Sequence, residues 1–156
     1  MAAQVHIVMG SKSDMPVAQK AVDVLKELGI AYKLDVASAH RTPKRVVEIA
    51  EKSPAGIFIA IAGLSAALPG AVAAHTTKPV IGVPVSGKVN LDSILSIVQM
   101  PPGIPVAGVG LDMGGNAALL AAEILALADP ALAKRLGAHR AEMARKLEED
   151  SKTLEG

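Results

Sequence analysis

Short apolar runs along the chain alternate with longer stretches in which apolar residues recur at helical spacing. The apolar runs predict five strands, at residues 5–9, 30–36, 56–61, 79–83 and 106–111. The helical spacing predicts helices at residues 14–28, 42–50, 66–75, 91–98, 116–127 and 130–150. Glycine or proline separates most of these segments, as expected where one element ends and the next begins.

Apolar strands that alternate with helices predict a parallel sheet covered by helices on both faces. The pattern fits an α/β protein with a three-layer, flavodoxin-like, doubly wound five-stranded sheet and a C-terminal helix. We interpret residues 1–156 as a single domain, with residues 130–156 as a C-terminal helical extension. Ligands of such sheets bind beyond the carboxyl ends of the strands. The segments that follow the first three strands, at 10–14, 38–41 and 63–68, are therefore expected to meet at one edge.

Charge and composition narrow the class of partner. A formal net charge of +1 predicts neither nucleic acid nor a membrane surface as a partner. No run reaches the roughly 18 apolar residues of a membrane helix, and the first residues lack the basic start of a signal peptide, so a cytoplasmic protein is expected. The absence of cysteine excludes disulfides and thiolate chemistry. Small aliphatic residues dominate the apolar content and each buries little area, so a homo-oligomer is expected.

The first strand exit, at residues 10–14 (GSKSD), combines a glycine, two hydroxyls and a carboxylate. Gly10 permits a tight exit from the strand, and Ser11 and Ser13 lie beside free amides at a helix N-terminus, which attract anions. Asp14 can accept hydrogen bonds from a ribose diol, or it can simply cap the following helix. The segment lacks the spacing of a nucleoside-triphosphate loop.

The second exit, at residues 38–43 (SAHRTP), carries the most reactive side chains. Arg41 offers a planar donor fork that suits phosphate, and Ser38 adds a hydroxyl. His40 can exchange protons near neutral pH. The alternative is a capping histidine beside a surface arginine, but a strand before the segment and a helix after it favour a binding site.

The third exit, at residues 62–70 (AGLSAALPG), consists mostly of small residues. These let a planar ligand lie against the backbone, or they serve only close packing of a helix on a strand. Outside the exits, His6 is interpreted as a packed histidine within a strand, and His75 and His139 as surface residues. The histidine spacing fits no metal-binding motif.

Five motifs, in this order, resemble the N5-carboxyaminoimidazole ribonucleotide mutase family, and the match extends over roughly residues 4–130. They are residues 10–14, 38–43, 68–70 (LPG), 99–101 (QMP) and 116–121 (NAALLA). The family also includes aminoimidazole ribonucleotide carboxylases, which share the fold and use carbon dioxide directly. The resemblance implies an isomerase of purine biosynthesis, without a cofactor, that moves a carboxylate from the exocyclic nitrogen to imidazole C4.

The resemblance also implies roles for individual residues. Ser11, Ser13 and Arg41 would hold the 5′-phosphate of the substrate, and Asp14 its ribose hydroxyls. His40 would be the general acid and base. Further substrate contacts are expected from Gly10, Ser38, Ala39, Gly63, Ser65, Ala66 and Leu68. No metal is implied, and family members are octamers with sites at subunit contacts.

One position departs from the family pattern. Mutases of this family typically carry a second histidine directly before Leu-Pro-Gly, where this chain has Ala67. The order Gly-x-Ser-x-Ala-Leu at residues 63–68 is similar to that of the direct carboxylases, whereas residues 38–43 and 99–106 resemble the mutases. We therefore predict a mutase, with a carboxylase as the alternative. A non-catalytic, nucleotide-binding flavodoxin-like module is a remote alternative, because Ala67 replaces an expected functional group.

Overall fold

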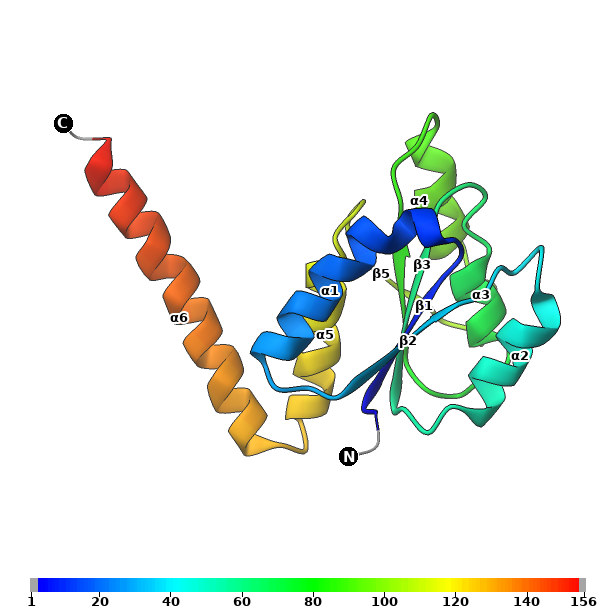
Figure 1. The fold of residues 1–156 in the computed structure, drawn as a ribbon, viewed down its shortest axis with the longest axis horizontal. Coiled ribbons are helices and arrows are strands. Elements are labelled where there is room, and N and C mark those ends of the chain that lie inside the picture. The colour runs from blue at the N-terminus through cyan, green and yellow to red at the C-terminus, as the bar shows by residue number, and fades with distance from the viewer. Residues whose placement is uncertain (1–2, 155–156) are drawn as a thin grey trace.

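The sheet has five parallel strands in the order β2-β1-β3-β4-β5. The structure, a computed structural model, describes residues 3–154, and the strands run together through the centre of the molecule (Figure 1). The strands are β1 (Val5–Met9), β2 (Tyr32–Val36), β3 (Ile57–Ala62), β4 (Val80–Pro84) and β5 (Ala107–Gly108). The three central strands are buried along their whole length, as a parallel sheet covered on both faces requires. This is the flavodoxin-like order that the sequence predicts.

Helices cover both faces of this sheet. They are the short η1 (Lys12–Asp14), α1 (Met15–Glu27), α2 (Pro43–Lys52), α3 (Leu68–Ala73), α4 (Asn90–Val98), α5 (Gly114–Ala126) and α6 (Pro130–Thr153). Helices α1 and α5 lie on one face, and α2, α3 and α4 lie on the other (Figure 1). Because successive strand residues point to opposite faces, Ile7 and Ile59 pack under α1 and α5, whereas Val8 and Phe58 pack on the other side.

The fifth strand is shorter than predicted. We expect residues 106–111 to form it, but only Ala107 and Gly108 pair with β4. A glycine within an edge strand adds no side-chain packing, so the pairing is weak there. Beyond Gly108 the chain turns toward the exit of β4, where the amide of Asp112 donates to the carbonyl oxygen of Pro84 at 2.8 Å. The residues assigned to a longer strand instead form a connection beside that exit.

One expectation about a helix start is wrong, and a second is confirmed only in part. Helix α3 starts at Leu68 rather than at residue 66, because Ala66 has a φ of 53°, in the left-handed region that cannot continue a right-handed helix. Asp14 stands at the N-cap position of α1 but makes no capping hydrogen bond to that helix. Its carboxylate instead accepts the Ser11 amide at 3.0 Å, within the turn that contains η1. Asp14 therefore belongs to the strand exit rather than to α1.

His6 is buried within β1, with 1% of its surface exposed. Its Nδ1 lies 2.8 Å from the Ser53 hydroxyl and its Nε2 lies 2.9 Å from the Asp35 carboxylate. Burial lowers the pKa of His6 and outweighs the hydrogen bond and charge of Asp35, which act to raise it. We assign the neutral ring so that Nε2 donates to Asp35 and Nδ1 accepts from Ser53, since a carboxylate only accepts. His6 is thus a satisfied structural residue, as the sequence indicates.

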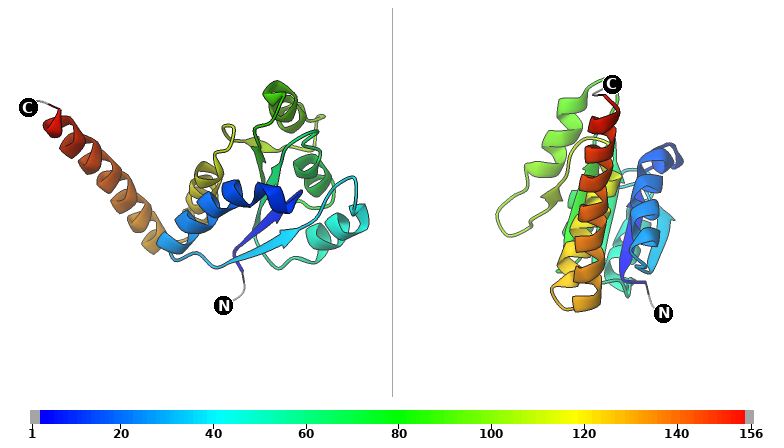
Figure 2. Two further views of the ribbon diagram at one scale, coloured as in Figure 1. Left: turned by 45° about the horizontal axis from the view of Figure 1, so that its top comes forward. Right: turned by 90° about the vertical axis from the view of Figure 1, so that its left-hand side faces the viewer.

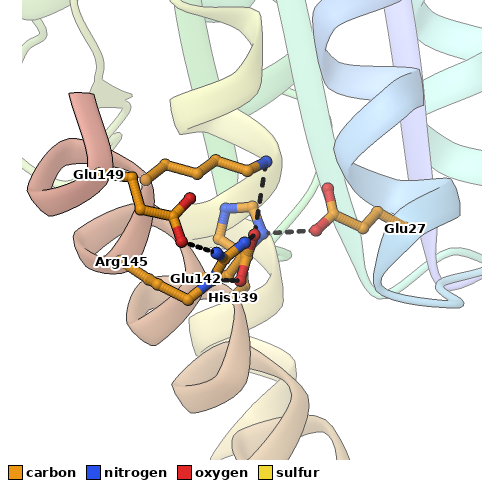
Figure 3. A network of polar contacts seen from close by, with 6 residues as sticks. Glu27, His139, Glu142, Arg145 and Glu149 are labelled. Atoms are coloured by element: carbon orange, nitrogen blue, oxygen red, sulfur yellow. Dashed lines mark hydrogen bonds and ion pairs between the residues drawn. The ribbon is translucent and has the colours of Figure 1, made fainter. Parts of the chain in front are cut away.

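Helix α6 projects away from the sheet, and only its first part packs against α5 (Figures 1 and 2). His139 joins this first part to the end of α1, because its Nδ1 lies within hydrogen-bond distance of the Glu27 carboxylate, at 2.8 Å. Farther along, Arg145 pairs with Glu142 and Glu149 on α6 itself, as Figure 3 shows. These pairs are typical of a solvated helix face, which is the role that the charge pattern of this segment predicts.

The close approach of α5 to α1 depends on Gly114. A Cβ atom at this position would lie 2.1 Å from the carbonyl oxygen of Val17, which is backbone and cannot rotate away. We expect Gly114→Ala to lower the free energy of unfolding by about 1–3 kcal/mol in urea denaturation, as overpacking does. Gly115→Ala is the matched control, because its nearest contact would be at 3.7 Å. Alanine there gains helix propensity, so that variant should be at least as stable as the parent; equal losses in both variants would contradict this account.

Candidate functional site

The segments that follow β1, β2, β3 and β4 surround one cavity of about 480 Å³. Every residue that is predicted to be catalytic or to bind substrate lies in its wall: Gly10, Ser11, Ser13, Asp14, Ser38, Ala39, His40, Arg41, Gly63, Ser65, Ala66 and Leu68. Residues far apart in the sequence meet here because parallel strands present all their carboxyl ends at one edge.

The first exit folds into a tight turn held by its own side chains. The Ser11 hydroxyl accepts hydrogen bonds from the amide of Ser13 at 3.4 Å and from its hydroxyl at 3.0 Å. The side chain of Asp14 is almost fully buried, with 7% of the residue exposed. Burial raises the pKa of Asp14, and hydrogen bonds from Ser11 and Ser13 and the charge of Arg41 offset this only in part. The wall therefore contains a carboxylate whose ionised form is poorly compensated by the protein itself.

Arg41 connects the first two exits. Its Nη2 donates to the carbonyl oxygen of Gly10 at 3.1 Å, and its Nε donates to the Ser38 hydroxyl at 3.3 Å. The Thr42 hydroxyl accepts the amide of Ser38 at 2.9 Å and closes the turn on the other side. Both acceptors of the guanidinium are neutral, so its positive charge is available to an anion in the cavity.

His40 lies in the same turn, and its side chain is exposed. It borders the cavity together with Asp14 and Gly63, which come from two other exits. An imidazole in this position can give a proton to a bound molecule or take one from it near neutral pH.

The third exit forms a wall of small residues. Ala62, Gly63, Ala66 and Ala67 all line the cavity. A Cβ atom on Gly63 would lie 3.7 Å from the Cβ of Val85, so this wall rests against the segment that follows β4. Side chains this small let a planar molecule approach the backbone closely, and they offer few polar groups to hold water.

The fourth wall of the cavity is not predicted from the sequence. Val85, Ser86 and Gly87 follow β4 and line the cavity as well. The rule that selects the first three exits also selects this one, because β4 ends at the same edge of the sheet. The segment contains no histidine, arginine or carboxylate, so its composition alone gave no sign of a site.

The described part of the chain contains no cluster of three or more histidine, aspartate or glutamate side chains that could hold a metal ion. Within residues 3–154, no helix combines the length and apolar character needed to cross a membrane. The chemistry available in the cavity is that of hydroxyls, amides, one carboxylate, one guanidinium and one imidazole.

A family model described as AIR carboxylase matches residues 4–146. The chain belongs to the AIR carboxylase family. This membership confirms the relationship that the five sequence motifs indicate. The AIR carboxylase match begins just before β1 and ends within α6, so it includes every wall of the cavity.

Named members of the AIR carboxylase family resemble this chain over most of its length. It is 60% identical over 142 residues to the N5-carboxyaminoimidazole ribonucleotide mutase of Methanocaldococcus jannaschii, and the alignment covers 90% of each chain. It is 45% identical over 157 residues to the mutase of Thermotoga maritima, and the alignment covers 97% of this chain and 92% of that one. The crystal structure of Treponema denticola PurE2-S38D superposes with a TM-score of 0.89 at 36% identity over 100% of both chains. Treponema denticola PurE gives a TM-score of 0.87 at 37% identity, over 97% of this chain and 98% of that one.

The raised pKa of Asp14 predicts a stability cost at the site. A folded-state pKa above the unfolded value means that the folded protein binds the proton more tightly, so at pH 7 the ionised carboxylate disfavours folding. Asp14→Asn removes this charge and retains an oxygen that can accept the Ser11 amide. We therefore expect Asp14→Asn to raise the melting temperature at pH 7, with the gain shrinking as the pH falls toward the pKa. Asp23→Asn, on the exposed side of α1, is the control and should change little; a lower melting temperature in Asp14→Asn alone would contradict the interpretation.

Proposed function

We propose that this protein is an N5-carboxyaminoimidazole ribonucleotide mutase of de novo purine biosynthesis that acts in the cytoplasm. It moves a carboxylate from the exocyclic nitrogen of the substrate to imidazole C4. Two of its relatives, from Methanocaldococcus jannaschii and Thermotoga maritima, carry the name of this mutase. The observation that carries the proposal is the single cavity in which Asp14, His40 and Arg41 face a wall of small residues.

The charged and hydroxyl groups of the cavity suit the ribose phosphate of such a substrate. Arg41 exchanges its neutral acceptors for a phosphate, which forms stronger, charge-assisted hydrogen bonds. Ser11 already accepts two hydrogen bonds from Ser13, so its own proton remains free to donate to the phosphate. Asp14 accepts hydrogen bonds from the ribose hydroxyls, and these compensate a carboxylate that the protein itself stabilises poorly.

His40 moves the proton of the reaction. Protonated His40 donates to the exocyclic nitrogen as the bond between that nitrogen and the carboxylate carbon breaks, which releases carbon dioxide. C4 of the substrate then attacks the carbon of carbon dioxide, and the side chain of His40, now neutral, takes the proton from C4. A carboxylate thus moves from nitrogen to C4 while a proton moves from C4 to nitrogen. The small residues between Ala62 and Ala67 favour this sequence, because their apolar side chains offer carbon dioxide a surface beside the ring.

The assay that tests the proposal offers the purified protein two substrates separately. One is N5-carboxyaminoimidazole ribonucleotide, and the other is aminoimidazole ribonucleotide with bicarbonate. Turnover of the first is expected. Turnover of the second alone would make the protein a carboxylase, the activity for which the matched family model is named and which the order of residues 63–68 favours. Binding of both without turnover would indicate a non-catalytic nucleotide-binding module.

We expect His40→Asn to lower kcat by at least about 100-fold, because no other group would transfer the proton. Nucleotide binding measured by calorimetry should stay within about threefold of the parent protein, since His40 is not part of the phosphate or ribose contacts. His75→Asn is the matched control, as His75 is exposed and lies outside the cavity wall. A fully active His40→Asn variant would remove His40 from the mechanism.

We also propose that the protein is a homo-oligomer, with an octamer as the expected size. Leu136, Met143, Leu147 and Leu154 recur at helical spacing and form one apolar stripe along α6. Leu136 packs against the core, whereas Met143, Leu147 and Leu154 are 51%, 70% and 84% exposed. A projecting helix with an exposed apolar stripe gains most by packing on another copy of the same chain.

We expect Leu147→Glu to reduce the mass of the assembly measured by sedimentation velocity, because a charge in the stripe disfavours its burial. Ala138→Glu adds the same charge nine positions earlier, about half a turn away around the helix, where it should leave the assembly intact. The same assembly mass in both variants would show that the stripe does not form a subunit contact.

A further inference from the structure

We infer that Asp112 is a positioning residue that fixes the fourth wall of the cavity: its backbone holds the end of β4, and its side chain holds the segment that follows. This inference rests on the proposed function, since it concerns the cavity in which the substrate binds. Asp112 is not in the cavity wall itself. It lies in the short connection between β5 and α5, which the sequence analysis assigned in part to a strand.

Two hydrogen bonds join Asp112 to the end of β4 and to the segment that follows it. The amide of Asp112 donates to the carbonyl oxygen of Pro84 at 2.8 Å, and Oδ1 accepts the amide of Ser86 at 2.8 Å. One residue therefore holds the last residue of β4 and the second residue after it. Lys20 donates to the carbonyl oxygen of Asp112 at 3.1 Å, which ties the same residue to α1.

The backbone of Asp112 lies in an unfavourable region, with a φ of 60°. Aspartate tolerates the left-handed region better than most residues, yet the conformation still costs free energy and persists only where surrounding contacts maintain it. Here the contacts to Pro84, Ser86 and Lys20 supply that support. The hydrogen bonds to Pro84 and Ser86 point to a function in holding the chain where it leaves β4 rather than to an ordinary turn.

The carboxylate of Asp112 is ionised at neutral pH, which strengthens its hold on Ser86. Burial alone would raise the pKa of Asp112, but hydrogen bonds from Ser86 and the positive charge of Lys20 lower it overall. A hydrogen bond to an ionised acceptor is stronger than one between neutral groups.

The held segment also supports the third wall. The amide of Val85 donates to the carbonyl oxygen of Ala62 at 3.0 Å, and Val85 lies next to Gly63. The amide of Gly87 is held in turn by Oδ1 of Asn90 at 2.8 Å. If the contact between Asp112 and Ser86 is lost, the segment is fixed at its ends but not at its centre. Substrate binding must then order this segment, so the affinity for substrate falls more than kcat does.

Two variants separate the carboxylate from the backbone conformation. Asp112→Gly adopts a φ of 60° without strain but has no acceptor for Ser86, whereas Asp112→Asn tolerates the same φ and retains an oxygen at the Oδ1 position. We expect Asp112→Gly to raise KM about tenfold, the effect of losing one hydrogen bond to a charged group, while kcat falls less than about threefold. Asp112→Asn should keep KM within about threefold of the parent. Amide hydrogen exchange of Ser86, followed by NMR, should accelerate at least about tenfold in Asp112→Gly only.

The exchange measurement does not depend on the reaction. If the parent protein turns over neither substrate, the proposed function fails, and Ser86 exchange still decides whether Asp112 holds the fourth wall. If the parent is active but Asp112→Gly has a normal KM, the role of Asp112 is disproved and the proposed function stands. Equal Ser86 protection in the two variants, or an equal rise of KM in both, would also overturn the inference.

Discussion

The parallel direction of all strands is the constraint on which the site depends. Parallel strands need crossover helices, and these return the chain to the opposite edge of the sheet before each new strand begins. Every strand therefore ends at the same edge. Ser11, Arg41 and Gly63 reach one cavity for this reason, although each belongs to a different part of the chain. No long-range side-chain interaction is needed to bring them together, and Arg41 only secures a convergence that the backbone has already produced.

Close packing of small residues sets the positions of the helices that carry the site. Gly114 touches the backbone of Val17, and the buried alanines of α5 let that helix lie against both α1 and the sheet. Helix α1 starts directly after Asp14, so its placement also places the carboxylate. The apolar stripe that continues along α6 beyond α5 offers further surface to bury.

The sequence predicted the fold well where the pattern of apolar residues is strong. The buried runs of β1, β3 and β4 stand out because both of their faces are covered, and their exits follow from them. The prediction was poorer where tertiary contacts determine the conformation of the backbone. The connection that contains Asp112 is apolar enough to suggest a strand, but hydrogen bonds to the exit of β4 give it another conformation. The left-handed backbone of Ala66 has no sequence signal, since alanine is a good helix former.

The distribution of unfavourable features supports the location of the site independently of any motif. His6 and Asp35 lie away from the cavity, and their interactions are satisfied: the neutral ring of His6 donates to Asp35, and Lys33 and Arg45 pair with the Asp35 carboxylate. Around the cavity the reverse holds. Asp14 is a buried carboxylate with a raised pKa, and Ala66 and Asp112 are the non-glycine residues with positive φ within residues 3–154. A fold selected only for stability would remove such features, whereas a site that must present a carboxylate and fixed walls to a ligand has to retain them. The energetically unfavourable residues therefore lie at the same edge of the sheet at which the strand topology places the site.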